Sequence, residues 1–459
     1  MALMKSISGI RGTIGGKPGD NLTPIDIVKF TAAYGSMLLE QGKGTKVVVG
    51  RDGRMSGEMV RSLVVNTLLA LGLDVIDLGL STTPTVEMGV VFENAAGGII
   101  LTASHNPKQW NALKLLNEKG EFISAEAGRR VLQSAEELSF SFAAVDRLGS
   151  YIQTDALLQQ HIDAILLHPL VQKQKIAEKK FKVVVDAINS SGAIAVPALL
   201  RQLVITDIVV LNADMHGDFA HNPEPLAENL TELCATVVNE QAQLGIAVDP
   251  DVDRLCFVSE DGTLFGEEYT LVAVADYVLQ HQKGNTVSNL SSTRALHDIT
   301  EKHGGSYYAS AVGEVNVVSK MKEVNAVIGG EGNGGIIDPQ LHYGRDALGG
   351  IALFLSHLAQ SGVSASQLRK SYPDYFMSKQ KIDLPKDTAV AQLLEQVKEQ
   401  YRSFQVNTED GVKVDFEQGW VHLRASNTEP IIRIYSEAPT AAEANRLAQE
   451  VIQKINTWI

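Results

Sequence analysis

The chain has 459 residues, of which 44% are hydrophobic and 20% are charged, a balance that excludes a disordered chain and allows a large core. Its 40 basic and 54 acidic residues give a net charge of −14, which argues against nucleic acid as a partner because phosphate backbones are bound by clustered Lys and Arg. At about 150 residues per domain, the length predicts three or four domains.

Membrane and secretion signals are not found in the sequence. The longest apolar runs fall far short of the ~18 residues that a membrane span needs, and residues 1–16 lack a basic-then-apolar leader pattern. Cys234 and Cys256 are too few to staple a chain of this size and have no metal-ligand spacing. We therefore expect a cytoplasmic protein with no membrane partner, and the sequence leaves its oligomeric state open.

Short apolar, β-branched segments alternate with helical patterns between residues 46 and 328, which favours mainly parallel sheets. The predicted strands in this part are 46–49, 75–78, 97–101, 182–185, 208–211, 245–248, 255–258, 286–290 and 326–328. The predicted helices are 56–71, a helix that starts near residue 191, 269–278 and 293–302. A polar, helical stretch over 134–160 interrupts the alternation and is a candidate domain boundary.

From about residue 371 the pattern changes. Helices are predicted over 388–401 and 441–455, and closely spaced strands over 412–416, 421–423 and 431–435. Strands in direct succession indicate antiparallel pairing. The predicted fold class is therefore α/β, with three similar α/β domains of mixed, mainly parallel sheets plus a smaller C-terminal α+β domain. The predicted domains are residues 1–150, 151–253, 254–370 and 371–459.

A polar turn, Thr102-Ala103-Ser104-His105-Asn106-Pro107, follows the apolar strand 97–101. Sites form at the carboxyl ends of strands in parallel sheets, so Ser104 and His105 are candidate site residues. Lys114 is a nearby cation that can steady an anionic oxygen. The alternative is an ordinary polar turn whose side chains cap backbone groups.

Three carboxylates alternate in Asp249-Pro250-Asp251-Val252-Asp253-Arg254, directly after strand 245–248. Mg²⁺ takes oxygen ligands, commonly a few carboxylates and a phosphate oxygen. A bound cation would also relieve the repulsion among the three acids. The alternative is a solvated acidic turn, while an EF-hand is not supported because its later Gly and terminal Glu are missing.

Phosphate and sugar contacts are predicted in three further segments. Arg424, the hydroxyls of Ser426 and Thr428, and Arg433 on the next strand make a candidate phosphate clamp, since guanidinium groups match phosphate oxygens. The alternative is a polar surface turn with a chance Arg pair. The other two segments supply Glu331 and Asn333 of the glycine-rich run 329–335, as candidates for sugar hydroxyls, and Arg11, as a partner for a phosphate or a surface acid.

These motifs together resemble the α-D-phosphohexomutase superfamily, which comprises phosphoglucomutases, phosphomannomutases and phosphoglucosamine mutases. The resemblance extends over essentially the whole chain. It rests on Arg11, TASHNP at 102–107, DPDVDR at 249–254, GEGNGG at 330–335 and RASNTEP at 424–430, in the family's order. The resemblance implies four domains around a central cleft.

The resemblance also implies roles for individual residues. Ser104 would carry a phosphoryl group, and one Mg²⁺ would be held beside it by Ser104, Asp249, Asp251 and Asp253. Arg11, His105 and Lys114 match positions at the reacting centre, and Lys114 or a histidine is the candidate to take the hydroxyl proton. The residues expected to bind substrate are Arg254, Glu331, Asn333, Arg424, Ser426, Asn427, Thr428 and Arg433.

The implied reaction is a two-step phosphoryl transfer that interconverts 6-phospho and 1-phospho hexoses through phosphorylated Ser104 and a sugar bisphosphate. Gly335, where many bacterial relatives have His, and the run Gly313-Glu314-Val315-Asn316 are closer to archaeal-type phosphoglucosamine mutases. Glucosamine 6-phosphate is therefore the expected substrate, and glucose or mannose phosphate is the alternative. A phosphatase and a sugar-phosphate sensor are less favoured, because the first needs no second phosphate clamp and the second needs no nucleophile.

Overall fold

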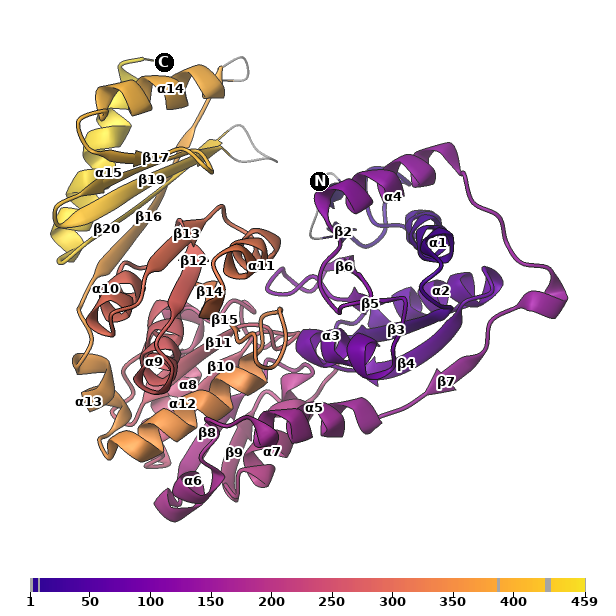
Figure 1. Cartoon of the computed structure of the whole chain (residues 1–459), viewed down its shortest axis with the longest axis horizontal. Helices are drawn as coiled ribbons and strands as arrows, with labels where there is room; N and C mark the ends of the chain where they lie inside the picture. The colour runs from indigo at the N-terminus through magenta and orange to yellow at the C-terminus, as the bar shows by residue number, and fades with distance from the viewer. Residues whose placement is uncertain (1–2, 7–8, 386–388, 426–430, 459) are drawn as a thin grey trace.

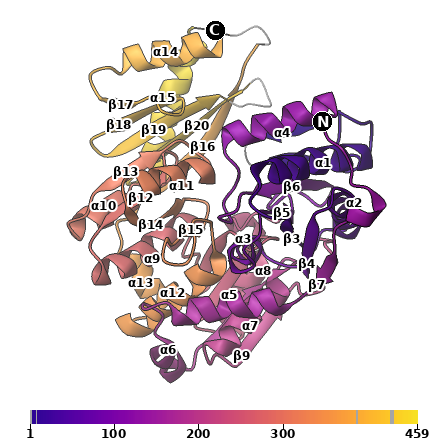
Figure 2. The same ribbon diagram turned by 45° about the vertical axis from the view of Figure 1, so that its right-hand side comes forward.

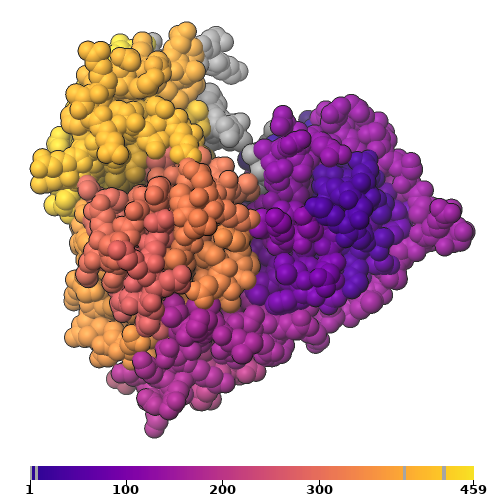
Figure 3. Space-filling view, viewed as in Figure 1, coloured from indigo at the N-terminus to yellow at the C-terminus, as the bar shows by residue number. Residues whose placement is uncertain are grey.

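The structure is a computed structural model that describes residues 3–6, 9–385, 389–425 and 431–458. Four units follow one another along the chain in a crescent (Figure 1, Figure 2). The first unit and the C-terminal unit stand at its two ends, and the surface between them is hollowed (Figure 3). Within the described residues, no helix is long and apolar enough to cross a membrane.

The first unit is a seven-stranded mixed sheet in the order β1-β2-β6-β5-β3-β4-β7. Its strands are β1 (Met4–Ser6), β2 (Gly9–Thr13), β3 (Lys46–Arg51), β4 (Asp74–Leu80), β5 (Gly97–Leu101), β6 (Trp110–Leu116) and β7 (Tyr151–Gln153). Its helices are α1 (Pro24–Gln41), α2 (Gly57–Ala70), α3 (Thr83–Phe92) and α4 (Ala125–Glu137). In β3, Val47 and Val49 pack under α1 and α2 and Val48 packs under α3, so helices bury both faces of the sheet.

The second unit has a four-stranded sheet in the order β11-β10-β8-β9. Its strands are β8 (Lys182–Asp186), β9 (Asp207–Leu211), β10 (Leu244–Val248) and β11 (Leu255–Ser259). Its helices are α5 (Ala156–Leu167), α6 (Lys173–Lys179), α7 (Gly192–Gln202) and α8 (Thr231–Asn239). The sequence analysis grouped strand 255–258 with the third domain. The structure differs because β11 folds back along β10 as an antiparallel neighbour and completes the second sheet.

The third unit repeats this plan, with a four-stranded sheet in the order β13-β12-β14-β15. Its strands are β12 (Asn285–Asn289), β13 (Tyr307–Ser310), β14 (Ala326–Glu331) and β15 (Gly335–Ile337). Its helices are α9 (Glu267–His281), α10 (Ala295–Lys302), α11 (Glu314–Glu323), α12 (Ala347–Ser361) and α13 (Ala365–Lys370). One continuous apolar core joins it to the second unit, and within that core Phe257 of β11 stacks on Phe354 of α12 with ring centroids 3.8 Å apart.

The C-terminal unit is a five-stranded antiparallel sheet in the order β16-β20-β19-β18-β17. Its strands are β16 (Phe376–Asp383), β17 (Gln405–Asn407), β18 (Val412–Phe416), β19 (Gly419–Ala425) and β20 (Ile431–Ala438). Its helices, α14 (Val390–Gln400) and α15 (Ala441–Asn456), cover one face and enclose a separate core. The other face contacts the third unit, where Ser291 Oγ lies 2.9 Å from His422 Nδ1 and the Arg294 amide donates to Glu437 Oε1 at 2.9 Å.

The predicted fold class is confirmed: three α/β units with mixed sheets precede a smaller unit with an antiparallel sheet. The strands and helices listed above are present within a few residues of their expected positions, whereas the stretch 134–160, expected to be helical, is mostly non-helical: α4 ends at Glu137, β7 takes Tyr151–Gln153 into the first sheet, and α5 begins at Ala156. The strands that the sequence analysis did not identify include β1 and β7, which are short and lie at the two edges of the first sheet, but also the internal strands β2 and β6 and the longer β16. Apart from the placement of β11 in the second unit, the domain limits given above stay predictions.

Candidate active site

Ser104 lies in the turn between β5 and β6, at the carboxyl end of β5. Its φ of 49° falls in the left-handed region, which side-chain-bearing residues rarely adopt. The Thr102 hydroxyl accepts the Ser104 N–H at 2.9 Å and fixes this conformation. The buried Ser104 hydroxyl then donates to Asp249 Oδ2 at 2.7 Å and lies 3.4 Å from His105 Nδ1. Ser104 therefore reaches out of the first sheet and meets the aspartate loop of the second unit.

Arg54, which the sequence analysis did not single out, holds this turn in place. Its guanidinium is buried and forms an ion pair with Asp52 at 2.9 Å. It also donates to four carbonyl oxygens of the turn, those of Ser104, Asn106, Pro107 and Trp110. Asp52 in turn accepts from the Thr102 hydroxyl at 2.6 Å. The sequence feature that could have identified Arg54 is the charged turn at the carboxyl end of β3, because β3 lies beside β5 in the sheet.

The three predicted metal ligands, Asp249, Asp251 and Asp253, come together at the carboxyl end of β10. All three are fully buried, and one carboxylate oxygen from each lies within 4.8 Å of the other two. The loop is tight enough to place Val252 at a φ of 60°, which is unusual for a β-branched residue. Asp249 Oδ1 accepts the backbone amides of Asp253 and Arg254, both at 3.1 Å. This burial argues against the alternative that the sequence left open, in which the three aspartates form a solvated acidic turn.

Two cations from other units balance the three carboxylates. Lys114 of β6 donates to Asp251 Oδ2 at 2.7 Å and to Asp253 Oδ2 at 3.2 Å, and Arg345 donates to Asp253 Oδ2 at 2.7 Å. Burial, reinforced by the two neighbouring aspartates, raises the pKa of Asp249 well above its usual range. Burial acts the same way on Asp251, but the charge and hydrogen bond of Lys114 outweigh it and lower the pKa of Asp251. The triad therefore carries strongly unequal affinities for protons.

Arg345, which follows β15 and was also missed, links the aspartate loop to the glycine-rich sugar-loop candidate. Besides Asp253, its guanidinium pairs with Glu314 Oε2 at 2.9 Å and with Glu331 Oε2 at 3.1 Å. Glu331 Oε1 accepts from Asn289 at 2.8 Å and from the Gly313 amide at 3.1 Å. Glu331 is thus held rigidly at the end of β14, next to the charged centre.

The remaining candidates near Ser104 are three basic side chains. Arg11 of β2 donates to Asn106 Oδ1 at 2.9 Å, and so lies against the same turn. Desolvation, with Arg254 and Arg11 nearby, lowers the pKa of His105 well below its usual value. Arg254 pairs with Glu224 at 3.2 Å, while its buried Nε has no hydrogen-bond partner in the described residues. The centre therefore contains positive groups with unused donor capacity, despite the acidic composition of the chain.

The clamp and sugar-loop candidates lie farther along the crescent. Asn333 lies between β14 and β15, where its Oδ1 accepts the Gly335 amide at 3.2 Å. Arg424 of β19 and Arg433 of β20 are register partners, so they lie side by side on one face of the sheet. Arg424 Nε also lies 2.7 Å from Asp410 Oδ2. The other predicted clamp residues, Ser426, Asn427 and Thr428, lie outside the described residues.

The first two units are locked together around the site. The Ser190 hydroxyl accepts the Gly53 amide at 2.9 Å and donates to the Pro250 carbonyl at 2.6 Å. Thr83, in the first turn of α3, donates its amide to the Asp251 carbonyl at 2.8 Å and its hydroxyl to Asp251 Oδ2 at 2.6 Å. The structure thus brings Ser104, Lys114, Arg11 and the aspartate loop into one centre. The roles predicted for these residues remain predictions.

All four units match the phosphoglucomutase/phosphomannomutase family. The α/β/α domain I matches residues 4–142, domain II residues 159–262, domain III residues 266–375 and the C-terminal domain residues 380–454. These matches follow the order of the units along the chain.

Curated relatives cover nearly the whole chain. A protein of Thermococcus kodakarensis named phosphoglucomutase/phosphomannomutase is 36% identical over 94% of this chain and 95% of its own length. A protein of Methanopyrus kandleri named probable phosphoglucosamine mutase is 33% identical over 98% of this chain and 97% of its own. Among solved structures, a phosphoglucomutase/phosphomannomutase family protein of Burkholderia thailandensis superposes with a TM-score of 0.84 at 27% identity, covering 98% of this chain and 97% of its own.

We predict that Arg54→Lys loosens the turn that holds Ser104. A lysine offers a point charge and cannot reproduce the fork of guanidinium donors to four carbonyls and Asp52. The expected loss is about 2–4 kcal/mol in the free energy of unfolding, measured by urea titration. Arg129→Lys, at an exposed position of α4, is the matched control and should change nothing. Equal stability of Arg54→Lys and the control would contradict this assignment.

Proposed function

The chain belongs to the phosphoglucomutase/phosphomannomutase family and is a phosphohexomutase, an isomerase that moves a phosphoryl group within a hexose phosphate, and we propose that it converts glucosamine 6-phosphate to glucosamine 1-phosphate. The observation that carries the proposed mechanism is the 2.7 Å hydrogen bond from Ser104 Oγ to Asp249 Oδ2. It places a buried hydroxyl beside three carboxylates and several cations, where a phosphoryl group would find its charge neutralised.

We further propose that Mg²⁺ binds at Asp249, Asp251 and Asp253, next to Ser104. The donor set fits a hard cation, because all the ligand atoms are oxygens. Asp251 Oδ1 and Asp253 Oδ1 are also buried without a hydrogen-bond partner among the described residues, a costly arrangement unless a cation binds them. When bound, Mg²⁺ would supply positive charge that polarises the phosphoryl oxygens.

In the proposed first half-reaction, the free hydroxyl oxygen of the substrate attacks the phosphorus carried on Ser104. The bond between phosphorus and Ser104 Oγ breaks, the hydroxyl proton passes to a base, and a sugar bisphosphate results. After the bisphosphate turns over in the cleft, Ser104 Oγ attacks the phosphorus of its other phosphoryl group. The bond from that phosphorus to the sugar oxygen breaks, the sugar oxygen takes up a proton, and the product leaves with Ser104 phosphorylated again. Arg11, Lys114 and Arg254 contribute positive charge around this centre, and Asp249 holds Ser104 Oγ in place.

A row of basic side chains in the C-terminal unit supports a second phosphate site. Lys381 of β16, Arg433 of β20 and Arg424 of β19 are successive register partners, so all three lie on one face of the sheet. Like charges directly opposite one another are unfavourable, and an anion bound between them relieves the repulsion. A mutase needs such a site for the phosphate that is not being transferred, whereas a phosphatase does not.

Two kinds of sugar phosphate are candidate substrates of this reaction, an amino-sugar phosphate and a glucose or mannose phosphate. Relatives named as phosphoglucosamine mutases, at 33% identity in the case of Methanopyrus kandleri, favour the amino sugar. The 36% identical relative named phosphoglucomutase/phosphomannomutase favours glucose or mannose phosphate. We place the enzyme in the cytoplasm, where Cys234 and Cys256, both free in the structure, stay reduced.

Ser104→Ala should lower kcat by about 10⁴-fold or more, because the covalent route is lost while the remaining groups still bind the sugar phosphate. The measurement is a steady-state mutase assay together with calorimetric substrate binding. Ser139→Ala, at an exposed serine of the same unit, is the control. Near-wild-type turnover by Ser104→Ala would refute the nucleophile.

Asp251→Asn should weaken Mg²⁺ binding by more than about 100-fold, since removing a ligand costs more than removing an outer partner. The amide keeps the shape of the side chain and can still accept from Thr83. Calorimetric titration of Mg²⁺ measures the change, with the exposed Asp214→Asn as the control. Unchanged affinity in Asp251→Asn would show that the ion binds elsewhere.

The sugar assignment is tested by comparing kcat/KM for glucosamine 6-phosphate, glucose 6-phosphate and mannose 6-phosphate. We expect the amino sugar to be preferred by about 10-fold or more, the scale on which a few polar contacts discriminate between related substrates. The Ser104→Ala variant supplies the background rate for each sugar. A higher kcat/KM for glucose or mannose phosphate would show that this sugar is the substrate, and would leave the proposed mutase mechanism unchanged.

A further inference from the structure

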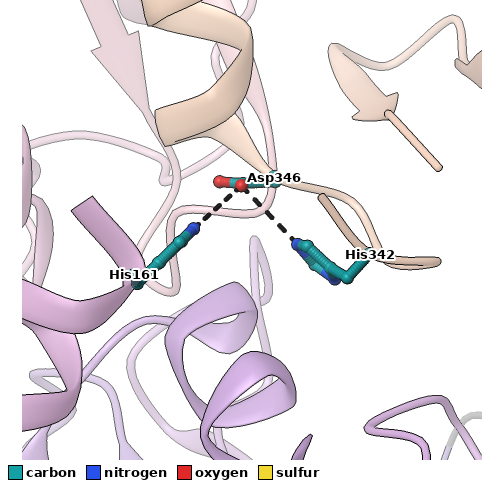
Figure 4. A group of neighbouring side chains, drawn as sticks. All are labelled: His161, His342 and Asp346. Carbon is teal, nitrogen blue, oxygen red and sulfur yellow. Dashed lines mark hydrogen bonds and ion pairs between the residues drawn. The ribbon is translucent and has the colours of Figure 1, made fainter. Parts of the chain in front are cut away.

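A second cluster of titratable side chains lies outside the aspartate loop, where three units meet (Figure 4). His161 comes from α5 of the second unit, and His342 and Asp346 come from the segment between β15 and α12 of the third. Glu87 of α3, in the first unit, lies beside them. The phosphoryl-transfer mechanism uses none of these four residues.

The geometry of the cluster is that of a small metal site. Asp346 Oδ2 lies 3.0 Å from His161 Nε2 and 3.5 Å from His342 Nε2 (Figure 4), and one ligand atom from each residue lies within 4.8 Å of the others. Four-coordinate Zn²⁺ has bonds of about 2.0–2.1 Å to nitrogen and oxygen, which places neighbouring ligand atoms about 3.3 Å apart. The two observed separations from Asp346 bracket that value.

Each of the three side chains also has a second contact, made by an atom that does not face the cluster. His161 Nδ1 lies 3.0 Å from Thr85 Oγ1, His342 Nδ1 lies 3.4 Å from Glu87 Oε2, and Asp346 Oδ1 accepts the Leu348 amide at 2.9 Å. Metal-binding histidines characteristically offer their other ring nitrogen to such a partner, which fixes the tautomer and the ring orientation. In this arrangement both Nε2 atoms are left to face Asp346.

The protein alone does not satisfy this cluster. Glu87 is 1% exposed, yet neither of its carboxylate oxygens has a hydrogen-bond partner in the part of the chain that the structure describes, and the same is true of both ring nitrogens of His342. A cation on His342 Nε2 would leave the proton on Nδ1, directed toward Glu87. Gly344 permits this approach, because a Cβ there would lie 2.0 Å from Glu87 Oε2 and 2.8 Å from His342 Nδ1.

We propose that His161 Nε2, His342 Nε2 and Asp346 Oδ2 bind a divalent transition metal of the Zn²⁺ class, with water as a fourth ligand. Two imidazoles favour Zn²⁺, Co²⁺ or Ni²⁺ over Mg²⁺, which takes oxygen ligands. The site is thus chemically distinct from the aspartate loop. Its ligands come from the second and third units and its outer partners, Thr85 and Glu87, come from the first, so a bound metal would connect the three units.

The test uses the full-length protein and Co²⁺ as the probe. The protein is stripped with a chelator, dialysed, and titrated with Co²⁺ in a large excess of Mg²⁺, which occupies the aspartate loop. We expect one Co²⁺ per chain, with the intense visible absorption of four-coordinate Co²⁺ and a rise in the melting temperature. Absence of tightly held Co²⁺ under these conditions would overturn the proposal.

Variants locate the ion. His161→Gln and His342→Gln should lose the visible absorption, and Glu87→Gln should keep it while binding Co²⁺ at least about 10-fold more weakly. His216→Gln is the matched control, because His216 and Asp214 form an exposed pair at 3.6 Å in which the other ring nitrogen of His216, Nδ1, accepts the Asp218 amide at 3.2 Å. Unaltered absorption in His161→Gln and His342→Gln would refute the assignment, and would leave the two histidines as structural partners of Asp346.

X-ray absorption of the Co²⁺-loaded wild-type protein decides the question even where a variant fails to fold. Two imidazole ligands are expected, and fewer than two would overturn the proposal. The mutase assay in Mg²⁺ alone is a separate measurement. Failure of the proposed Co²⁺ site would therefore leave the proposed mutase function standing, and the reverse also holds.

Discussion

The buried carboxylate triad is the constraint on which the rest of this structure depends. Asp249, Asp251 and Asp253 lie in a water-poor interior, where unpaired charge is expensive. Their neutralising groups come from other parts of the chain: Lys114 from the first sheet and Arg345 from the third unit. Balancing this charge therefore requires the three α/β units to meet at one place. The same requirement positions Ser104, whose hydroxyl is bound to Asp249 only when the first and second units are packed together.

A small number of polar contacts connect this centre to neighbouring segments and hold them in place. Arg54 fixes the Ser104 turn from one side, and Ser190 joins that side to the aspartate loop. Arg345 extends the network to Glu331, so that the end of β14 is tied to the same charges. Next to Arg345 in the chain, Asp346 faces two histidines. The chain thus places two candidate cation sites near one junction, one of oxygen donors only and one with imidazoles, and their chemistry suits different ions.

The C-terminal unit relates to this framework in a different way. It has its own apolar core, and it contacts the third unit through polar pairs such as Ser291 with His422 and Arg294 with Glu437. Interfaces of this polar kind permit relative movement more readily than a shared apolar core does. The second and third units, by contrast, share one continuous core. A basic row on a unit that has its own core would suit the proposed mechanism, in which a bisphosphate intermediate turns over between two half-reactions.

The sequence by itself determined the features that are local. The periodicity predicted the alternating units, and the polar turns after strands predicted Ser104 and the aspartate loop, because the carboxyl ends of parallel strands collect functional groups. It did not indicate that β11 completes the second sheet, since an apolar strand carries no mark of its partner. Nor did it identify Arg54, Arg345, Glu87 or His161, which look like ordinary residues of turns and helices. Only the tertiary structure decided their importance, because each acquires its partner from a distant part of the chain when the units pack against one another.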